Sequence, residues 1–146
     1  DLVYGVGDNF PHPYTEDDAA QFLLSTVGRT DSTQLCLTQN DRLIGMVGIV
    51  STCGFSPSSV FAEIGYWTGR SARGQGVTTL AISAYASHLF EKYPSLNRLE
   101  ALTFPDNAAS QRVLEKAGFV REAVLRGRAR QRGRIVDDFL YARWRP

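Results

Sequence analysis

The chain has 146 residues, 43% of them hydrophobic, which is enough for one domain with a sizeable core. No apolar run approaches the ~18 residues of a membrane span, and the first residues lack the basic and then apolar order of a signal peptide. The two cysteines, Cys36 and Cys53, exclude a disulfide-rich secreted scaffold and are expected to be free, buried thiols in a reducing compartment. We therefore expect a single domain over residues 1–146 that is cytoplasmic and makes no membrane contact.

The net charge of +1 hides an uneven distribution of charge along the chain. Residues 1–69 carry two basic and eight acidic side chains, whereas residues 70–146 carry fourteen basic and seven acidic ones. A protein that binds a polyanionic ligand at one site and a cationic substrate at another would need such a division. Two oppositely charged, solvated surfaces that bind no ligand would give the same counts. Charge alone therefore does not distinguish the two interpretations.

The first expected element is a helix that begins after Thr15, a favourable N-cap. Residues 16–18 place negative charge in its first turn, and Gly28 can end it. Its apolar face would comprise Ala19, Phe22, Leu23 and Val27. Two β-prone runs then follow within residues 33–52, and the turn residues 39–41 between them predict a hairpin.

The rest of the chain alternates between strand and helix patterns. A strand over residues 60–67 precedes a long helix over residues 75–93, which Pro94 ends. The expected apolar face of this helix comprises Val77, Leu80, Ala81, Ala84, Tyr85, His88 and Leu89. The remaining elements are a strand (97–104), a helix (107–119) and two strands (120–130 and 134–144) joined by a turn at Arg132 and Gly133. This order predicts an α/β (α+β) fold, in which helices cover a mixed sheet.

A glycine-rich turn joins the strand at 60–67 to the long helix. The first backbone N–H groups of a helix have no partner within it, and the helix dipole adds positive potential there. Gly74 and Gly76 permit backbone conformations that a Cβ would resist, and Arg70 and Arg73 add forked donors for phosphate oxygens. The turn therefore suits a bulky diphosphate, although a plain loop can have the same composition. It has neither the Walker pattern nor the three-glycine dinucleotide pattern.

Residues 73–78 (RGQGVT) resemble the pyrophosphate-binding loop of the GNAT superfamily of N-acetyltransferases. The surrounding blocks at 63–81, 97–126 and 137–143 are similar to the RimJ/RimL branch, whose characterised members acetylate protein N-terminal amines. The resemblance covers roughly residues 42–146, with the blocks in the family's order. It implies a mostly antiparallel mixed sheet in which one central pair of parallel strands splays apart.

The resemblance also implies acetyl-CoA as cosubstrate. No Cys/His cluster has metal-ligand spacing, so we expect no metal. The pyrophosphate would bind Arg73, Gly74, Gln75, Gly76, Val77 and Thr78, and backbone groups of Tyr66, Trp67 and Thr68 would pair with the pantetheine arm. Thr78 departs from the family pattern, which usually has Gly or Ala there. The family's N-terminal strand and helix are also missing ahead of residue 8, so we expect a truncated chain with an incomplete wall on the substrate side.

Glu63 is the first candidate for the base that deprotonates the amine. Strand alternation places it with Phe61, Gly65 and Trp67, on the opposite face from Tyr66, and aromatic neighbours would raise the pKa of its carboxyl group toward the working range. A water chain could instead carry the proton while Glu63 orients the amine. A solvated glutamate or a structural ion pair is the alternative without a catalytic role.

Asn107 and Ser110 are the candidates for binding the departing thiolate. Asn107 stands at a helix N-cap and Ser110 on the first turn. Many enzymes of the GNAT superfamily use a tyrosine one turn further along as the acid that protonates the thiolate, but this chain has Leu114 there. The resemblance therefore implies that Ser110 forms the hydrogen bond to the sulfur. An ordinary capping motif would look the same. Of the two histidines, His88 is expected to pack in the core and His12 to border the substrate.

Arginine recurs at every second position from Arg126 to Arg134. An extended strand would point most of these side chains to one side, where they could contact RNA, the ribosome or an acidic protein. A charged edge hairpin that discourages strand pairing is the alternative, and we favour it.

The leading hypothesis is an N-acetyltransferase that moves an acetyl group from acetyl-CoA to a primary amine by direct attack on the thioester. A non-catalytic acyl-CoA sensor, a small-molecule amine acetyltransferase and a nucleic-acid-binding domain are the alternatives. The acceptor, either a peptide N-terminus or a small amine, and the oligomeric state, monomer or homodimer, are left open by the sequence.

Overall fold

A computed structural model describes residues 8, 10–11, 13–26, 33–50 and 55–146. The predictions made for His12, Val27, Gly28 and Cys53 lie outside these residues. The helices are α1 (Glu16–Thr26), the short 3-10 helix η2 (Arg70–Ala72), α2 (Val77–Lys92) and α3 (Ala108–Lys116). The strands are β1 (Leu35–Gln39), β2 (Arg42–Ile49), β3 (Phe61–Thr68), β4 (Arg98–Thr103), β5 (Val120–Gln131) and β6 (Arg134–Trp144).

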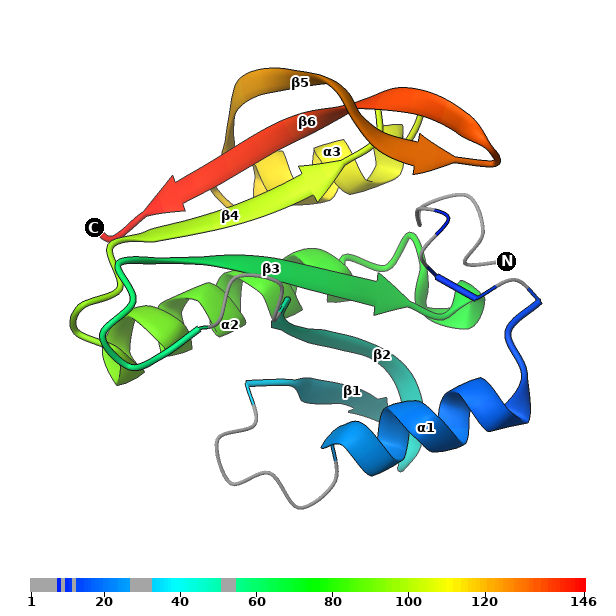
Figure 1. Cartoon of the computed structure of the whole chain (residues 1–146). Coiled ribbons are helices and arrows are strands. Elements are labelled where there is room, and N and C mark those ends of the chain that lie inside the picture. Colours follow the sequence, from blue (N-terminus) through cyan, green and yellow to red (C-terminus); the bar gives the residue numbers. More distant parts are fainter. Residues whose placement is uncertain (1–7, 9, 12, 27–32, 51–54) are drawn as a thin grey trace.

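The strands form one six-stranded sheet in the order β1-β2-β3-β4-β6-β5. Neighbouring strands run antiparallel except for β3 and β4, which are parallel. This parallel pair requires a crossover, which α2 provides, and Figure 1 shows α2 and α3 on the same side of the sheet. The predicted mixed α/β (α+β) sheet, mostly antiparallel with one parallel pair at its centre, is confirmed.

The hydrophobic core lies between the sheet and the helices α2 and α3. Its fully buried members include Ile82 and Leu89 of α2, Leu114 of α3 and Leu99 of β4. Each such side chain contributes on the order of 1.5–3 kcal/mol by leaving water. The core therefore holds α2 and α3 against the middle strands of the sheet.

The predicted buried face of α2 is partly wrong. Tyr85 and Leu89 are buried as expected, but Leu80 is 72% exposed, and Ala84 and His88 also face solvent. The buried side chains are Ile82, Tyr85, Ala86, Leu89 and Phe90. Small and apolar residues occur all around this helix, so their spacing fits more than one face. His88 is consequently a surface residue and not a core histidine.

The helix α1 begins as predicted. Thr15 caps it, because its Oγ1 accepts a hydrogen bond from the N–H of Asp18 at 3.2 Å while the Asp18 carboxylate accepts one from the N–H of Thr15 at 2.8 Å. The Thr15 hydroxyl group also donates to the Asp18 carboxylate at 2.6 Å, and this bond, followed by the one from the Thr15 N–H, lowers the pKa of Asp18. Of the predicted apolar face, Phe22 and Leu23 remain 38% and 55% exposed.

Cys36 is free, as predicted, but it is exposed and not buried. It lies on β1, which is the edge strand of the sheet. The described helices α2 and α3 cover the middle strands, so the side chains of β1 are mostly exposed.

The hairpin of β5 and β6 is strongly curved in Figure 1. Its register shifts between Arg121 and Ala123 and again between Leu125 and Ala129, and such bulges bend a strand. Gly127 lies inside the second bulge with a φ of 60°. The arginine pattern on β5 therefore does not follow one regular strand.

The turn between β5 and β6 falls at Arg132 and Gly133, as predicted, with φ values of 52° and 73°. The backbone N–H groups of both residues donate to the Asp8 carboxylate at 2.5 and 2.7 Å. The N–H of Asp8 in turn donates to the carbonyl of Arg130 at 2.9 Å. These bonds hold the segment around Asp8 against the tip of the hairpin.

Arg145 closes the C-terminal end of α2 and the loop that follows it. Its guanidinium donates to four carbonyls at 2.6–3.2 Å and lies 5.3 Å from the centre of the Phe90 ring. The accepting carbonyls belong to Phe90, Tyr93, Pro94 and Leu96. A cation at the negative end of the helix dipole is stabilising.

Replacing Arg145 by alanine should lower the free energy of unfolding by about 2–3 kcal/mol, because half-buried carbonyls lose a charged donor. Arg145→Lys should recover only part of the lost free energy of unfolding, since an ammonium group cannot reach all four carbonyl acceptors. Urea unfolding followed by circular dichroism measures both. Arg126→Ala, an exposed arginine on β5, is the control and should change stability by less than about 0.5 kcal/mol. An Arg145→Ala protein as stable as this control would contradict the assignment.

Candidate active site

The two parallel strands separate at the centre of the sheet. Only three residue pairs join β3 to β4, and the last of them is Glu63 with Glu100. Beyond this pair β3 continues to Thr68 and β4 to Thr103 without pairing to each other. This arrangement agrees with the predicted splay.

The backbone groups of β3 divide between the gap and β2. The N–H of Val50 donates to the carbonyl of Glu63, and the N–H of Gly69 donates to the carbonyl of Ile44. Hydrogen bonding alternates along an antiparallel strand. The odd-numbered residues of β3 between Glu63 and Gly69, including Trp67, therefore direct their backbone N–H and C=O groups toward β2. The backbone groups of Tyr66 and Thr68 point into the gap, where the Nε of Arg73 donates to the Thr68 carbonyl at 3.1 Å.

A cleft of about 470 Å³ occupies this gap. Its lining includes Glu63 and Trp67 from one face of β3 and Tyr66 and Thr68 from the other. Successive side chains of a strand point to opposite faces, so the cleft passes through the sheet. Of the predicted site residues, the cleft brings together Glu63, Tyr66, Trp67, Thr68, Arg73, Gly74, Thr78, Asn107 and Ser110.

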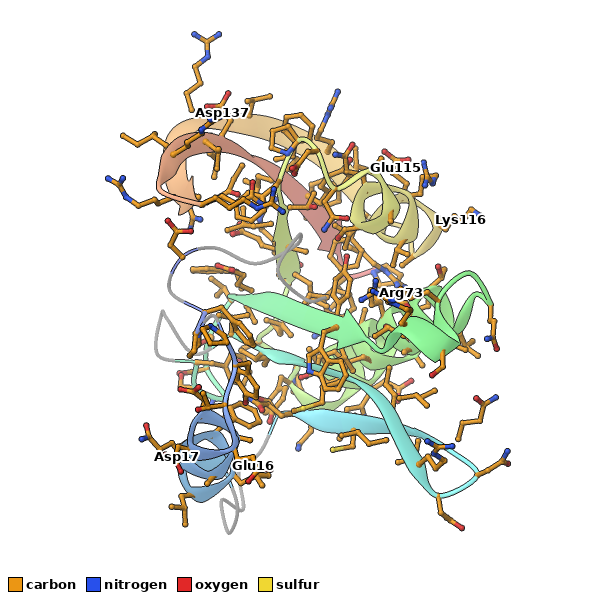
Figure 2. The ribbon with its side chains drawn as sticks, turned by 90° about the vertical axis from the view of Figure 1, so that its right-hand side faces the viewer. Glu16, Asp17, Arg73, Glu115, Lys116 and Asp137 are labelled. Atoms are coloured by element: carbon orange, nitrogen blue, oxygen red, sulfur yellow. The ribbon has the colours of Figure 1, made fainter. Side chains whose placement is uncertain are left out.

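The glycine-rich turn lies at one end of the cleft. Gly74 and Gly76 have φ values of 75° and 77°, which L-residues rarely adopt, and Gly76 is the N-cap of α2. No side chain caps this helix, so its first N–H groups are directed outward for an anion. Figure 2 shows Arg73 between the start of α2 and α3, whereas Glu16 and Asp17 lie at the far end of the molecule, on α1.

The other residues predicted for this turn have more local contacts. Gln75, Gly76 and Val77 do not line the cleft, and the Gln75 amide donates to the carbonyl of Ser71 at 2.8 Å. The hydroxyl groups of Thr78 and Thr68 lie 2.7 Å apart. Thr78, which departs from the family pattern, therefore joins the first turn of α2 to the end of β3 through this hydrogen bond.

Tyr66 and Ser110 meet on the helix side of the cleft. Their hydroxyl oxygens lie 2.6 Å apart, and burial raises the pKa of Tyr66 to about 12. The N–H of Ser110 donates to the Asn107 side chain at 3.1 Å, which confirms Asn107 as the N-cap of α3. Leu114 is fully buried in the core. Sequence reasoning missed this pair of hydroxyl groups, although strand alternation had already put Tyr66 on the face opposite Glu63.

Glu63 lies on the other side of the sheet. The pKa of its carboxyl group is raised, first because the group is half-buried and then because Glu100 and Asp138 are near, while Arg128 acts in the opposite direction. The predicted direction agrees, but the neighbouring charges were not foreseen. Arg128 donates to the Asp138 carboxylate at 3.0 Å, and Asp138 is 4% exposed. Arg128 is one of five arginines at alternate positions, and nothing in that pattern distinguishes it as the partner of Asp138.

Residues 8, 10–11, 13–26, 33–50 and 55–146 contain no group of three His, Cys, Asp or Glu side chains arranged to hold a metal ion. None of the helices within those ranges has the length and apolar character needed to cross a bilayer.

Comparisons with known proteins agree with this geometry. The "Uncharacterized N-acetyltransferase p20" of Bacillus licheniformis is 30% identical over 122 residues, which are 82% of this chain and 65% of that protein. The "Ribosomal-protein-serine acetyltransferase" of Escherichia coli (strain K12) is 32% identical over 98 residues, 67% of this chain and 54% of that protein. The chain thus spans between about half and two thirds of the length of these relatives.

Among solved structures, Mycobacterium smegmatis RimJ in complex with CoA-disulfide superposes with a TM-score of 0.73 at 25% identity. The match covers 88% of this chain and 61% of RimJ. The family model described as "Acetyltransferase (GNAT) domain" matches residues 4–120. With most of its length matched by that model and a splayed sheet beside a glycine-rich helix start, the chain belongs to the GNAT family of acetyltransferases.

Proposed function

We propose that this chain binds acetyl-CoA and transfers its acetyl group to a primary amine. The observation that carries the proposal is the cleft through the sheet, which has an anion-binding helix start on one side and a carboxylate with a raised pKa on the other. Membership of the GNAT family supports the same activity. Donor and acceptor would enter from opposite faces and meet between β3 and β4.

The residues on the helix side suit coenzyme A. The uncapped N–H groups of α2 and the Arg73 guanidinium offer donors to a diphosphate, and residues 73–78 would hold it. The backbone groups of Tyr66 and Thr68 point into the gap and can pair with the amides of an extended pantetheine arm. The Trp67 side chain would line the cleft on the opposite face, beside Glu63. When bound, acetyl-CoA supplies an acetyl group activated as a thioester.

The residues on the opposite face suit a cationic amine. Glu63, Glu100 and Asp138 place carboxylates there. Arg98 pairs with Glu100 and Arg128 with Asp138, so Glu63 is the carboxylate left to attract the amine. An ammonium group would be attracted to this surface and must lose a proton before it can attack. Glu63 accepts that proton, directly or through a water molecule, and its raised pKa makes it a stronger base than an ordinary carboxylate.

The reaction balances without a further reactant. The neutral amine nitrogen bonds to the acetyl carbon, the carbon–sulfur bond breaks, and its electron pair leaves with the sulfur. Glu63 holds the proton removed before the attack, and the second proton, which the nitrogen loses as the amide forms, ends on the CoA thiolate. The two hydroxyl oxygens lie 2.6 Å apart and either could be the donor, and in this proposal Tyr66 donates to Ser110, because a phenol is the more acidic hydroxyl. This leaves the Ser110 hydroxyl proton free to bond the departing sulfur, while Asn107 fixes the turn that carries Ser110.

We propose a protein N-terminus as the acceptor, since one relative is a ribosomal-protein-serine acetyltransferase. A small-molecule amine is the competing acceptor class. The sensor alternative is not favoured, because the cleft retains both a base and hydroxyl donors. One acetyltransferase domain over residues 1–146, a cytoplasmic location, a monomer or homodimer, and weak contact of Arg126–Arg134 with RNA or the ribosome stay predictions.

Incubating the protein with acetyl-CoA and peptides with free N-termini should release CoA thiol, which a chromogenic disulfide detects. Glu63→Gln should lower kcat by about 10²-fold or more, the usual contribution of a general base. Because the base must be ionised, kcat/KM of the wild type should fall as pH drops through the raised pKa of Glu63, which lies above the ordinary 4.5.

Glu91→Gln, an exposed carboxylate on α2, is the matched control and should keep wild-type activity. The same peptides with acetylated N-termini should release no thiol. Turnover with polyamines or small amines but not peptides would reject the peptide acceptor. No thiol release with any amine would reject the proposed activity.

Gly76→Val should weaken binding of CoA about tenfold or more by calorimetry. An added Cβ meets nothing within 4 Å at Gly76, but valine resists a φ of 77°, so the start of α2 must rearrange and its N–H groups turn away. Gly133→Val, at a left-handed position in the distant β5–β6 turn with equally open surroundings, is the control and should leave CoA affinity unchanged. Equal affinity for wild type and Gly76→Val would mean that the diphosphate binds elsewhere.

A further inference from the structure

Thr103 carries a buried hydroxyl group without a partner. The residue is 5% exposed, and its Oγ1 has no hydrogen-bond partner in the described structure. Burying a hydroxyl group that makes no hydrogen bond is unfavourable, and such groups are rare in folded proteins. Thr103 also lines the cleft between β3 and β4, so a bound ligand is the natural source of the missing partner.

The position of Thr103 relative to Tyr66 follows from the register of the strands. Glu63 and Glu100 form the last pair between β3 and β4, and Tyr66 and Thr103 each lie three residues further along. The two residues therefore stand at the same level on opposite sides of the gap. Both share a face with buried core residues of their strands, which is the face that α2 and α3 cover.

Residues with hydroxyl groups thus lie on both strands at one level of the cleft. On the β3 side the Tyr66 hydroxyl bonds Ser110, and on the β4 side the Thr103 hydroxyl is left over. In the proposed function Ser110 bonds the sulfur of the acyl donor, so the sulfur lies at the level of Tyr66 and therefore of Thr103. A thiolate in a buried site has several lone pairs and no proton, so it benefits from a second donor.

We propose that the Thr103 hydroxyl group donates a hydrogen bond to the sulfur of coenzyme A, from the wall of the cleft opposite Ser110. The inference rests on the proposed function and adds a residue to its machinery. As the carbon–sulfur bond breaks, the electron pair moves to a sulfur that two hydroxyl donors hold. Thr103 keeps its own proton throughout and acts by stabilising the leaving group.

Thr103→Val tests the proposal, because valine keeps the shape of threonine and removes the hydroxyl group. The ionisation of bound CoA is followed by the ultraviolet absorbance of its thiolate as pH is raised. A hydrogen bond to a charged acceptor changes an equilibrium about tenfold, so the pKa of the bound thiol should rise by about one unit in Thr103→Val. Thr103→Ser, which keeps the donor, should titrate like the wild type.

A second ligand separates the sulfur from the rest of the cofactor. Desulfo-CoA lacks the sulfur that would accept the hydrogen bond, so wild type and Thr103→Val should bind it equally by calorimetry. Thr103→Val should bind the CoA thiolate about tenfold more weakly than the wild type does. In steady-state acetyl transfer, Thr103→Val should lower kcat about tenfold and leave the KM of the amine unchanged. The variant should unfold at the wild-type temperature or above it, since it loses an unpaired buried hydroxyl group; if valine does not fit, Thr103→Ala replaces it.

Unchanged thiol titration and unchanged kcat in a folded Thr103→Val protein that binds CoA would overturn the inference and leave the proposed function intact. Equal weakening of CoA and desulfo-CoA would also overturn it, because the loss would then not involve the sulfur. A wild type that binds no CoA would reject the proposed function, and the inference with it.

Discussion

The site depends on the fact that two parallel strands stop pairing halfway along their length. After Glu63 and Glu100, the facing edges of β3 and β4 have no strand partner, and unpaired backbone groups inside a protein are costly. A ligand that supplies amides and carbonyls can satisfy them. The same separation lets side chains from both faces of the sheet reach one cleft, so a base and a set of hydroxyl donors come together although they lie on opposite sides.

The remainder of the fold keeps this opening in place. The core between the sheet and the helices fixes α2 and α3 next to the divergent ends of β3 and β4. Arg145 holds the far end of α2 through four carbonyls, and the hydroxyl pair of Thr68 and Thr78 joins its near end to β3. The helix that offers its N–H groups to an anion is therefore tied down at both ends, and an anion site benefits from such preorganisation.

Much of this could be predicted from the sequence, because the relevant signals are local. Turn residues and capping groups, such as Asn107 and the glycines at 74 and 76, have effects that depend on their own backbone. Burial depends on distant packing, so the α2 face and the exposure of Cys36 were predicted incorrectly. The Tyr66–Ser110 and Arg128–Asp138 contacts join positions 44 and 10 residues apart in the sequence. Spacing alone could not pair them.

The place of β6 in the sheet has a consequence for how the protein is made. β6 lies between β4 and β5, although β5 precedes it in the chain. β4 must therefore wait for residues 134–144 to leave the ribosome before its outer edge is covered, whereas β1, β2 and β3 can pair as soon as they emerge. A nascent chain that paused between β4 and β6 would present an open strand edge, which is prone to aggregation. Slow translation across this interval would make chaperone binding there advantageous.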